Sequence, residues 1–107
     1  MKYIIVLKFT LNIFVSASGE HCFSMYYHMF GSSMGSLLIE VVDAVSTRPV
    51  FEKTGDQGQQ WHLVQLLIQK QSVFKLKITA TRGQSYRSDI AIDELIIRPG
   101  RDCGECK

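Results

Sequence analysis

Residues 22–30 read Cys22-Phe-Ser-Met-Tyr-Tyr-His-Met-Phe30, and apolar side chains recur along them at every second position. Successive side chains of a β-strand point to opposite faces, so every second residue lies on the same face. The period is two and not the 3.6 of a helix, which predicts a strand with one buried and one partly wet face. The predicted buried face carries Phe23, Met25, Tyr27 and Met29.

Stretches with the same character follow along the chain. Phe74-Lys-Leu-Lys-Ile-Thr-Ala-Thr81 alternates strictly, so its Lys and Thr side chains are predicted to face water. Leu37–Val42 is a nearly continuous apolar run, which is typical of an interior strand. The other predicted strands are Val50–Lys53, Trp61–Gln69 and Ile90–Ile97, and turn-forming residues at 31–35, 46–49 and 54–58 separate them. About six strands spaced roughly 10–15 residues apart, with no convincing helix, predict an all-β fold, an antiparallel β-sandwich.

Length and charge exclude several classes of protein. The chain has 107 residues, which is close to the usual size of one domain. Its formal charge of +2 is too small for the phosphate-neutralising surface of a nucleic-acid binder, so no nucleic-acid partner is expected. Lys8 interrupts the only long apolar stretch, which leaves no run of the roughly 18–20 residues needed to cross a bilayer. No transmembrane segment is therefore predicted.

The first residues allow three interpretations. Met1–Ala17 begins with Lys2, carries an apolar run over 9–15 and ends on small residues, as a secretory signal peptide does. The strict alternation over 7–13 instead predicts a half-buried strand. A truncated or wrongly started reading frame is the third interpretation, and the residues alone leave all three open.

The cysteines are Cys22, Cys103 and Cys106. Spacing alone leaves open whether Cys22 and Cys103 are bridged or whether all three are ordinary thiols. A zinc site is disfavoured, because the pair at 103 and 106 supplies only two of the usual four ligands. A redox CxxC motif is disfavoured as well, because such motifs open a helix and this one follows a predicted strand.

Four segments, taken in order, carry a more specific pattern. They are Cys22-Phe-Ser-Met-Tyr-Tyr-His-Met-Phe-Gly31 followed by Gly35-Ser-Leu, Thr54-Gly-Asp-Gln-Gly-Gln-Gln-Trp61, Arg82-Gly-Gln-Ser-Tyr-Arg-Ser-Asp-Ile-Ala-Ile-Asp93, and Pro99-Gly-Arg-Asp-Cys103. Together they resemble the MAM domain, a family named after meprin, A5 antigen and receptor tyrosine phosphatase mu. The match covers residues 20–103, and its four ordered parts make it far more specific than any one of them.

The resemblance implies a jelly-roll-like sandwich in an extracellular or cell-surface protein. It also implies a disulfide between Cys22 and Cys103, which match two cysteines that pair in the family. The function it implies is a non-catalytic interaction or adhesion module within a larger cell-surface or secreted protein, whose parent is expected to be membrane-associated. The alternative is a small secreted accessory domain that assists the oligomerisation or positioning of a protease or receptor. The expected partners are other proteins, with self-association among them.

This chain departs from the family pattern at its beginning. Relatives carry a longer stretch before the position of Cys22, with two further cysteines, and nothing here resembles it. We therefore expect an N-terminally truncated sandwich: 1–19 as a signal-like segment or replacement strand, 20–103 as a partial MAM-like domain, and 104–107 as a tail. Missing strands leave sheet edges unpaired, so association of the isolated chain is expected. Cys106 has no counterpart in the family, and whether it is free, exchanges with Cys103 or links chains stays open.

Candidate ligands and core residues complete the predictions. Family members bind a cation with carboxylates, so Asp89 and Asp93 are the candidate ligands for Ca²⁺ or another cation; otherwise no cofactor is expected. Four residues apart on a strand they lie about 13 Å from each other, too far to share one ion. No nucleophile or acid is patterned near His21, His28 or His62, so no catalytic residue is predicted. The predicted core is Phe23, Met25, Tyr27, Trp61, Phe74, Ile90 and Ile92, with Trp61 as a wedge between the sheets.

Overall fold

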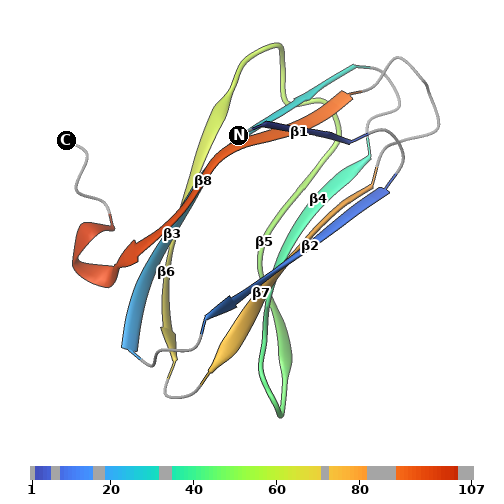
Figure 1. Cartoon of the computed structure of the whole chain (residues 1–107). Helices are drawn as coiled ribbons and strands as arrows, with labels where there is room; N and C mark the ends of the chain where they lie inside the picture. The colour runs from blue at the N-terminus through green and yellow to red at the C-terminus, as the bar shows by residue number, and fades with distance from the viewer. Residues whose placement is uncertain are drawn as a thin grey trace.

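The computed structural model, drawn in Figure 1, describes residues 2–5, 8–15, 19–31, 35–70, 73–81 and 89–103. Within these ranges the chain forms eight strands and one short 3₁₀ helix, and it contains no helix long and apolar enough to cross a membrane. The elements are β1 (Lys2–Ile5), β2 (Lys8–Val15), β3 (Gly19–Phe30), β4 (Ser36–Val42), β5 (Thr47–Thr54), β6 (His62–Lys70), β7 (Phe74–Thr81), β8 (Asp89–Pro99) and η1 (Gly100–Asp102).

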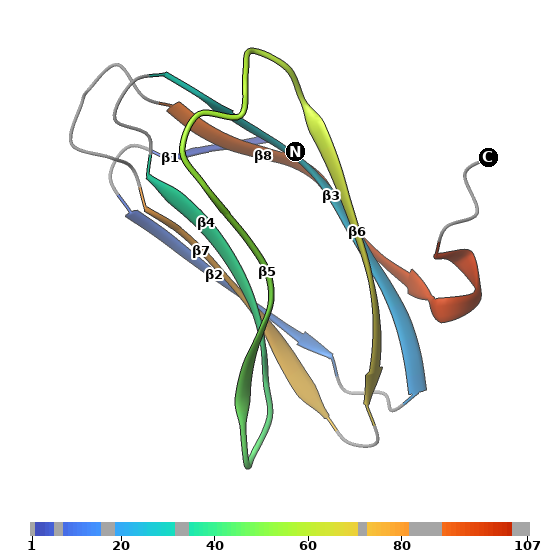
Figure 2. The same cartoon turned by 180° about the vertical axis from the view of Figure 1, so that it is seen from behind.

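The strands form two four-stranded sheets. Sheet A has the order β1-β8-β3-β6 and sheet B the order β2-β7-β4-β5, and every pairing within them is antiparallel. The two sheets face each other, as Figures 1 and 2 show from opposite sides. The predicted all-β antiparallel sandwich is therefore confirmed.

The core lies between the two sheets and follows the alternation of the strands. β3 contributes Phe23, Met25, Tyr27 and Met29, while Ser24, Tyr26 and His28 face outward. The other inward-facing residues include Leu37, Ile39, Val41, Val64, Ile68, Phe74, Leu76, Ile78, Ala80, Ile90 and Ile92. Six of the seven predicted core residues thus lie in the buried core, and the exception is the tryptophan.

Trp61 is not a core residue, because its side chain is 40% exposed. It precedes β6, whose inward positions are Val64 and Ile68, so that residues at odd positions face outward. The register shows the same parity, since Leu63 lies opposite the outward-facing Tyr26. The prediction failed because β6 is apolar at both parities and periodicity could not tell its two faces apart.

The N-terminal residues form edge strands of the sandwich. β2 pairs with β7 over its whole length, from Lys8 opposite Thr81 to Val15 opposite Phe74, and β1 pairs with β8. Leu11, Ile13 and Val15 pack against the core while Thr10 and Asn12 are exposed. Residues 8–15 thus form a half-buried strand in this structure, and the choice among the three interpretations of the segment stays a prediction.

The connection between β4 and β5 differs from the prediction. The turn lies at 43–46 and not at 46–49, because the Asp43 carboxylate accepts hydrogen bonds from the N–H groups of Val45 (2.9 Å) and Ser46 (2.8 Å). Pro49 belongs to β5, where the register shifts and leaves Val50 as an extra residue. A proline, which has no N–H to donate, is tolerated there because β5 is an edge strand with a bulge.

Candidate functional site

The outer face of sheet A carries an unusual number of large apolar side chains. Each of them is between 37% and 56% exposed. We call this set the outer-face patch: Tyr26, Phe30, Trp61, Leu63, Leu67 and Ile96. Strands β3, β6 and β8 position its members, because the inward positions of the same strands fill the core.

The strand register places two members of the patch directly side by side. Tyr26 of β3 lies directly opposite Leu63 of β6, and Ser24 lies opposite Ile96 of β8. Opposed side chains on one face have Cβ atoms about 4.5–5.5 Å apart. Gln65 of β6 lies on the other side of Ser24, so the apolar members of the patch lie around a small polar centre.

One end of the patch is shaped by the loop between β5 and β6. The His28 ring lies 5.3 Å from the Trp61 ring and 6.4 Å from the Phe30 ring. His62 Nε2 lies 2.7 Å from the Gln57 carbonyl oxygen, and since a carbonyl can only accept, Nε2 carries the hydrogen of this bond. The Gln57 N–H in turn donates to the Met29 carbonyl at 2.8 Å. These contacts tie the loop that carries Trp61 to the end of β3.

Tyr27 lies beneath this loop, on the inward face of β3. Its ring stacks on His62 at 5.3 Å and meets Phe51 edge-on at 5.6 Å, so aromatic contacts link sheet A to sheet B. Burial raises the pKa of Tyr27 above its ordinary value, because the charged phenolate loses its hydration. Because a tyrosine is already neutral at physiological pH, this shift matters only under alkaline conditions.

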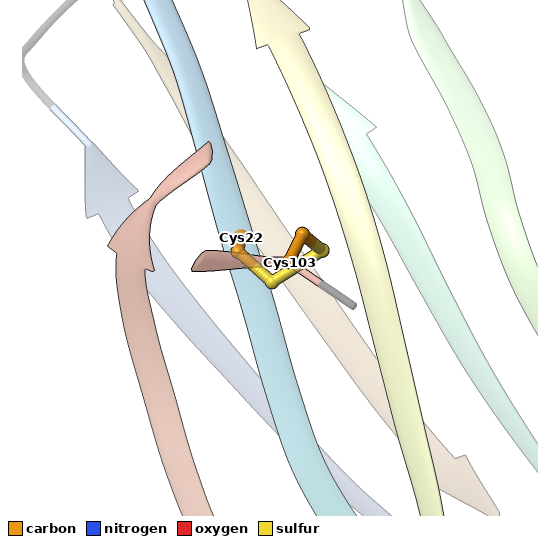
Figure 3. The surroundings of a disulfide bond; sticks show 2 residues. All are labelled: Cys22 and Cys103. Carbon is orange, nitrogen blue, oxygen red and sulfur yellow. A yellow bond between two sulfur atoms is a disulfide. The ribbon is translucent and has the colours of Figure 1, made fainter. Parts of the chain in front are cut away.

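The other end of the patch is held by a disulfide between Cys22 and Cys103, shown in Figure 3. Their Cα atoms are 5.0 Å apart, within the usual range for such bonds. This is the pairing that the family resemblance implies. Gly100 of η1 lies so close to β3 that a Cβ there would overlap Glu20 and crowd Leu67. The bond and this close approach hold η1 against the outer face of sheet A.

An acidic corner borders the patch on β8. Tyr26 lies opposite Asp93 and Ser24 opposite Ile96, so Glu94 and Leu95 together oppose Met25 in a bulge. Glu94 has φ of 53°, a left-handed conformation that is unfavourable for a residue with a Cβ. Its N–H donates to the Asp93 carboxylate at 2.8 Å.

The predicted cation ligands gain no support from this corner. Asp93 is half-buried on the outer face, whereas the side chain of Asp89 lies outside the described residues. Among the residues that the structure describes, no group of three or more His, Cys, Asp and Glu side chains could hold a metal ion. The involvement of Asp89 and Asp93 with a cation stays a prediction.

The outer face of sheet B is polar by comparison. It presents Lys75, Lys77 and Thr79 of β7, and Glu40 of β4 lies opposite Lys77. Apolar groups reach the surface instead at one end of the sandwich, in an open hollow of about 480 Å³. Its lining is Phe14, Val15, Val42, Asp43, Ala44, Val73, Phe74 and Lys75. The outer-face patch on sheet A is thus a local feature and not a general property of both faces.

Sequence reasoning missed Leu63 and Leu67 as surface residues. The available signal was the run Leu63-Val-Gln-Leu-Leu-Ile68, which is apolar at odd and even positions alike. In an antiparallel sheet with one face in the core, such a run leaves apolar side chains on the other face.

The MAM family model, meprin/A5/mu, matches residues 6–104. The chain belongs to the MAM family. The match includes β2, which lies before the segment in which we found the resemblance.

Curated relatives of this MAM domain are found in several vertebrates. The domain is 37% identical over 78% of its length to MAM domain-containing glycosylphosphatidylinositol anchor protein 1 of Gallus gallus. It is 31% identical over 79% of its length to thyroid hormone-induced protein B of Xenopus laevis, and 31% identical over 82% to human MAM domain-containing protein 2. The matched regions span only 9% to 13% of these relatives. Family membership and the anchored relatives support an extracellular or cell-surface location.

Proposed function

We propose that this MAM domain is an extracellular, non-catalytic adhesion module that binds another protein through the outer-face patch of sheet A. The single observation that carries the proposal is the patch itself, six large apolar side chains that are each at least 37% exposed on one sheet face. Large exposed apolar side chains gathered on one sheet face mark an interaction surface, because leaving them in water costs free energy.

The composition of the patch supports a protein partner. Tyr26, Phe30 and Trp61 are aromatic, and aromatic residues are enriched in the buried centres of protein interfaces. The neighbouring Asp93 and Glu94 would form part of a polar rim. The backbone beneath the patch is held by the β-ladders on both sides of β3 and by the disulfide. Little conformational entropy is therefore lost when a partner binds.

We place the module within a larger cell-surface or secreted protein. The basis is the small share of each relative that it matches, and the relatives' names, several of which refer to a glycosylphosphatidylinositol anchor. The domain's part in such a protein is recognition, and any catalysis belongs to other domains. The contacts of His28 and His62 fit this assignment, since one packs between aromatic rings and the other holds a loop.

The test uses fluorescent streptavidin tetramers of the disulfide-bonded domain on a panel of animal cell lines. We expect saturable binding that is lost after the cells are treated with trypsin. Tyr26→Ser, at the centre of the patch, is expected to weaken binding at least tenfold, as about 1.4 kcal/mol of lost contact would do. Val45→Ser is the matched control, because Val45 is 90% exposed on the β4–β5 turn, outside the patch.

The proposal is wrong if Tyr26→Ser binds as well as the unchanged domain while its thermal unfolding is also unchanged. Failure of every cell line to bind the tetramer would count against it as well. Because the readout is binding to cells, self-association of the domain in solution does not decide the outcome.

A further inference from the structure

The four edge strands of the sandwich differ in how well they are protected from pairing with another chain. β5 carries exposed Arg48, Pro49, Glu52 and Lys53, and its ladder is interrupted by the bulge at Val50. Proline, charges and bulges are the usual means by which proteins block an edge. On the opposite side, β1 has only four residues, while β2 pairs with β7 over eight residues without a register shift and has its one charged side chain, Lys8, at its start.

β6 has no proline, no bulge and no charged side chain except Lys70 at its end. It runs for nine residues without proline or glycine, and its pairing with β3 continues without a register shift from Gly19 opposite Lys70 to Tyr27 opposite His62. Between Leu63 and Gln69 it has no charged side chain. Figure 2 shows β6 and β5 along the same side of the sandwich, with β6 as the last strand of its sheet. β6 is therefore a long, regular edge that carries its one charge at its last residue, and half of its backbone hydrogen-bonding groups face away from β3.

We propose that β6 pairs antiparallel with β6 of a second copy of this chain, about a two-fold axis at Gln65. This inference rests on the proposed function, and it names a second copy of the chain as one partner of sheet A. In this register Leu63 lies opposite Leu67 of the second copy on the outer face. On the inner face, Val64 lies opposite Leu66 of the second copy.

The sequence of β6 is self-complementary about this axis. Val64 and Leu66 lie one residue from Gln65, and Leu63 and Leu67 lie two residues from it. At three residues the pair is Ile68 and the polar His62. His62 itself is engaged with the Gln57 carbonyl within its own chain, so it brings no unpaired polar group to the contact. No pair of like charges is opposed, and cross-strand apolar pairs each favour association.

Within sheet A the geometry limits the assembly to two copies. An isologous contact uses the β6 edge of each copy, and the contact is closed once these are joined. The other edge of sheet A is the four-residue β1, which is too short to propagate a ribbon of sheets. The product is one continuous eight-stranded sheet that places two outer-face patches side by side.

Sedimentation velocity of the disulfide-bonded domain from micromolar to millimolar concentration is the first test. We expect a reversible monomer–dimer equilibrium. Leu63→Lys is expected to raise the dissociation constant of the dimer at least tenfold. The two-fold axis brings the substituted residue of both copies into the contact. Val45→Lys adds the same charge and removes an exposed apolar side chain far from β6, so it should leave the equilibrium unchanged.

Crosslinking tests the register directly. In a Cys106→Ser background, Gln65→Cys places a thiol on the axis, where a short bis-methanethiosulfonate reagent would join the two copies. Gln69→Cys is the matched control on the same strand, because its two thiols would lie about 27 Å apart along the pair. Mass spectrometry of the crosslinked peptide identifies the joined residues.

Several results would overturn this inference. They are a monomer at every concentration, a dimer that Leu63→Lys leaves intact, and equal crosslinking at positions 65 and 69. A domain that stays monomeric yet binds cells through Tyr26 would refute the β6 contact and leave the proposed function standing. A dimer that binds no cells would refute the proposed function and leave the β6 contact standing.

Discussion

Removing the disulfide is the perturbation whose effect can be worked out most fully from this structure. Cys22 is 3% exposed, whereas Cys103 is more accessible. Cys103→Ser is therefore the better variant, because it opens the ring without placing a hydroxyl at the buried position. The strand ladders of β3 and β8 stay in place, since they do not depend on the bond.

The magnitude follows from the size of the ring. The bonded cysteines are 81 residues apart, and the loop-closure estimate for such a ring is about 4.5 kcal/mol at 25 °C. Domains of this size have total stabilities of about 5–15 kcal/mol. With an unfolding entropy of roughly 2.1 cal/mol/K per residue, the same loss lowers the melting temperature by about 20 °C.

The assay is urea unfolding of the oxidised domain and the Cys103→Ser variant, followed by circular dichroism. The slope of the unfolding free energy against urea concentration reports whether the unfolded state of the variant has expanded. Both proteins carry Cys106→Ser, so that Cys106 cannot pair with Cys22 when Cys103 is replaced, and Cys106→Ser alone is the control because its ring stays closed. A loss of less than about 1 kcal/mol in Cys103→Ser would refute the loop-closure reasoning, since the ring would then constrain the unfolded chain very little.

Three further predictions concern single positions. Gly100→Ala should lower the unfolding free energy by about 1–2 kcal/mol, because its Cβ would overlap Glu20; unchanged urea midpoints would show that η1 is not packed against β3. Glu94→Gly should raise the unfolding free energy by about 0.5–1 kcal/mol, because glycine relieves the left-handed conformation and alanine does not; an equal effect of both substitutions would contradict this reason. The raised pKa of Tyr27 contributes stability that is present below the unfolded-state pKa of about 10 and is lost as the pH rises through the folded-state value. In Tyr27→Phe the melting temperature should fall less steeply as the pH rises above about 10. A melting temperature that depends on pH as in the unchanged domain would contradict this prediction.

The part of the fold that could be predicted is the part in which one local pattern has one structural meaning. In β3 and β7, large apolar residues alternate with polar ones, so both the strand and its buried face follow from the period of two. In β6 the same reasoning located the strand and assigned the wrong face to Trp61, because apolar residues occupy both parities. The pairing of β6 with β3 decides the face, and that pairing joins residues some 40 positions apart.

The candidate site was less accessible to prediction. Tyr26, Leu63 and Ile96 belong to three strands, and no local pattern indicates that they are neighbours. The turn at 43–46 was missed for a related reason. The Asp43 carboxylate accepts backbone N–H groups and so starts the turn three residues before the position predicted from Pro49. Pro49 is tolerated in β5 because no strand pairs on the other side of β5.

The sequence by itself determined that the chain forms antiparallel strands, which residues most of those strands bury, and which cysteines match the paired positions of the MAM family. These properties depend on the side chain at each position and on its near neighbours. Only the tertiary structure decided which strands become edges, which apolar residues gather on the outer face of sheet A, and that β6 pairs on one side alone, with β3. Those properties depend on strand order and register, which are set by packing between residues distant in the chain, and a local pattern does not record them.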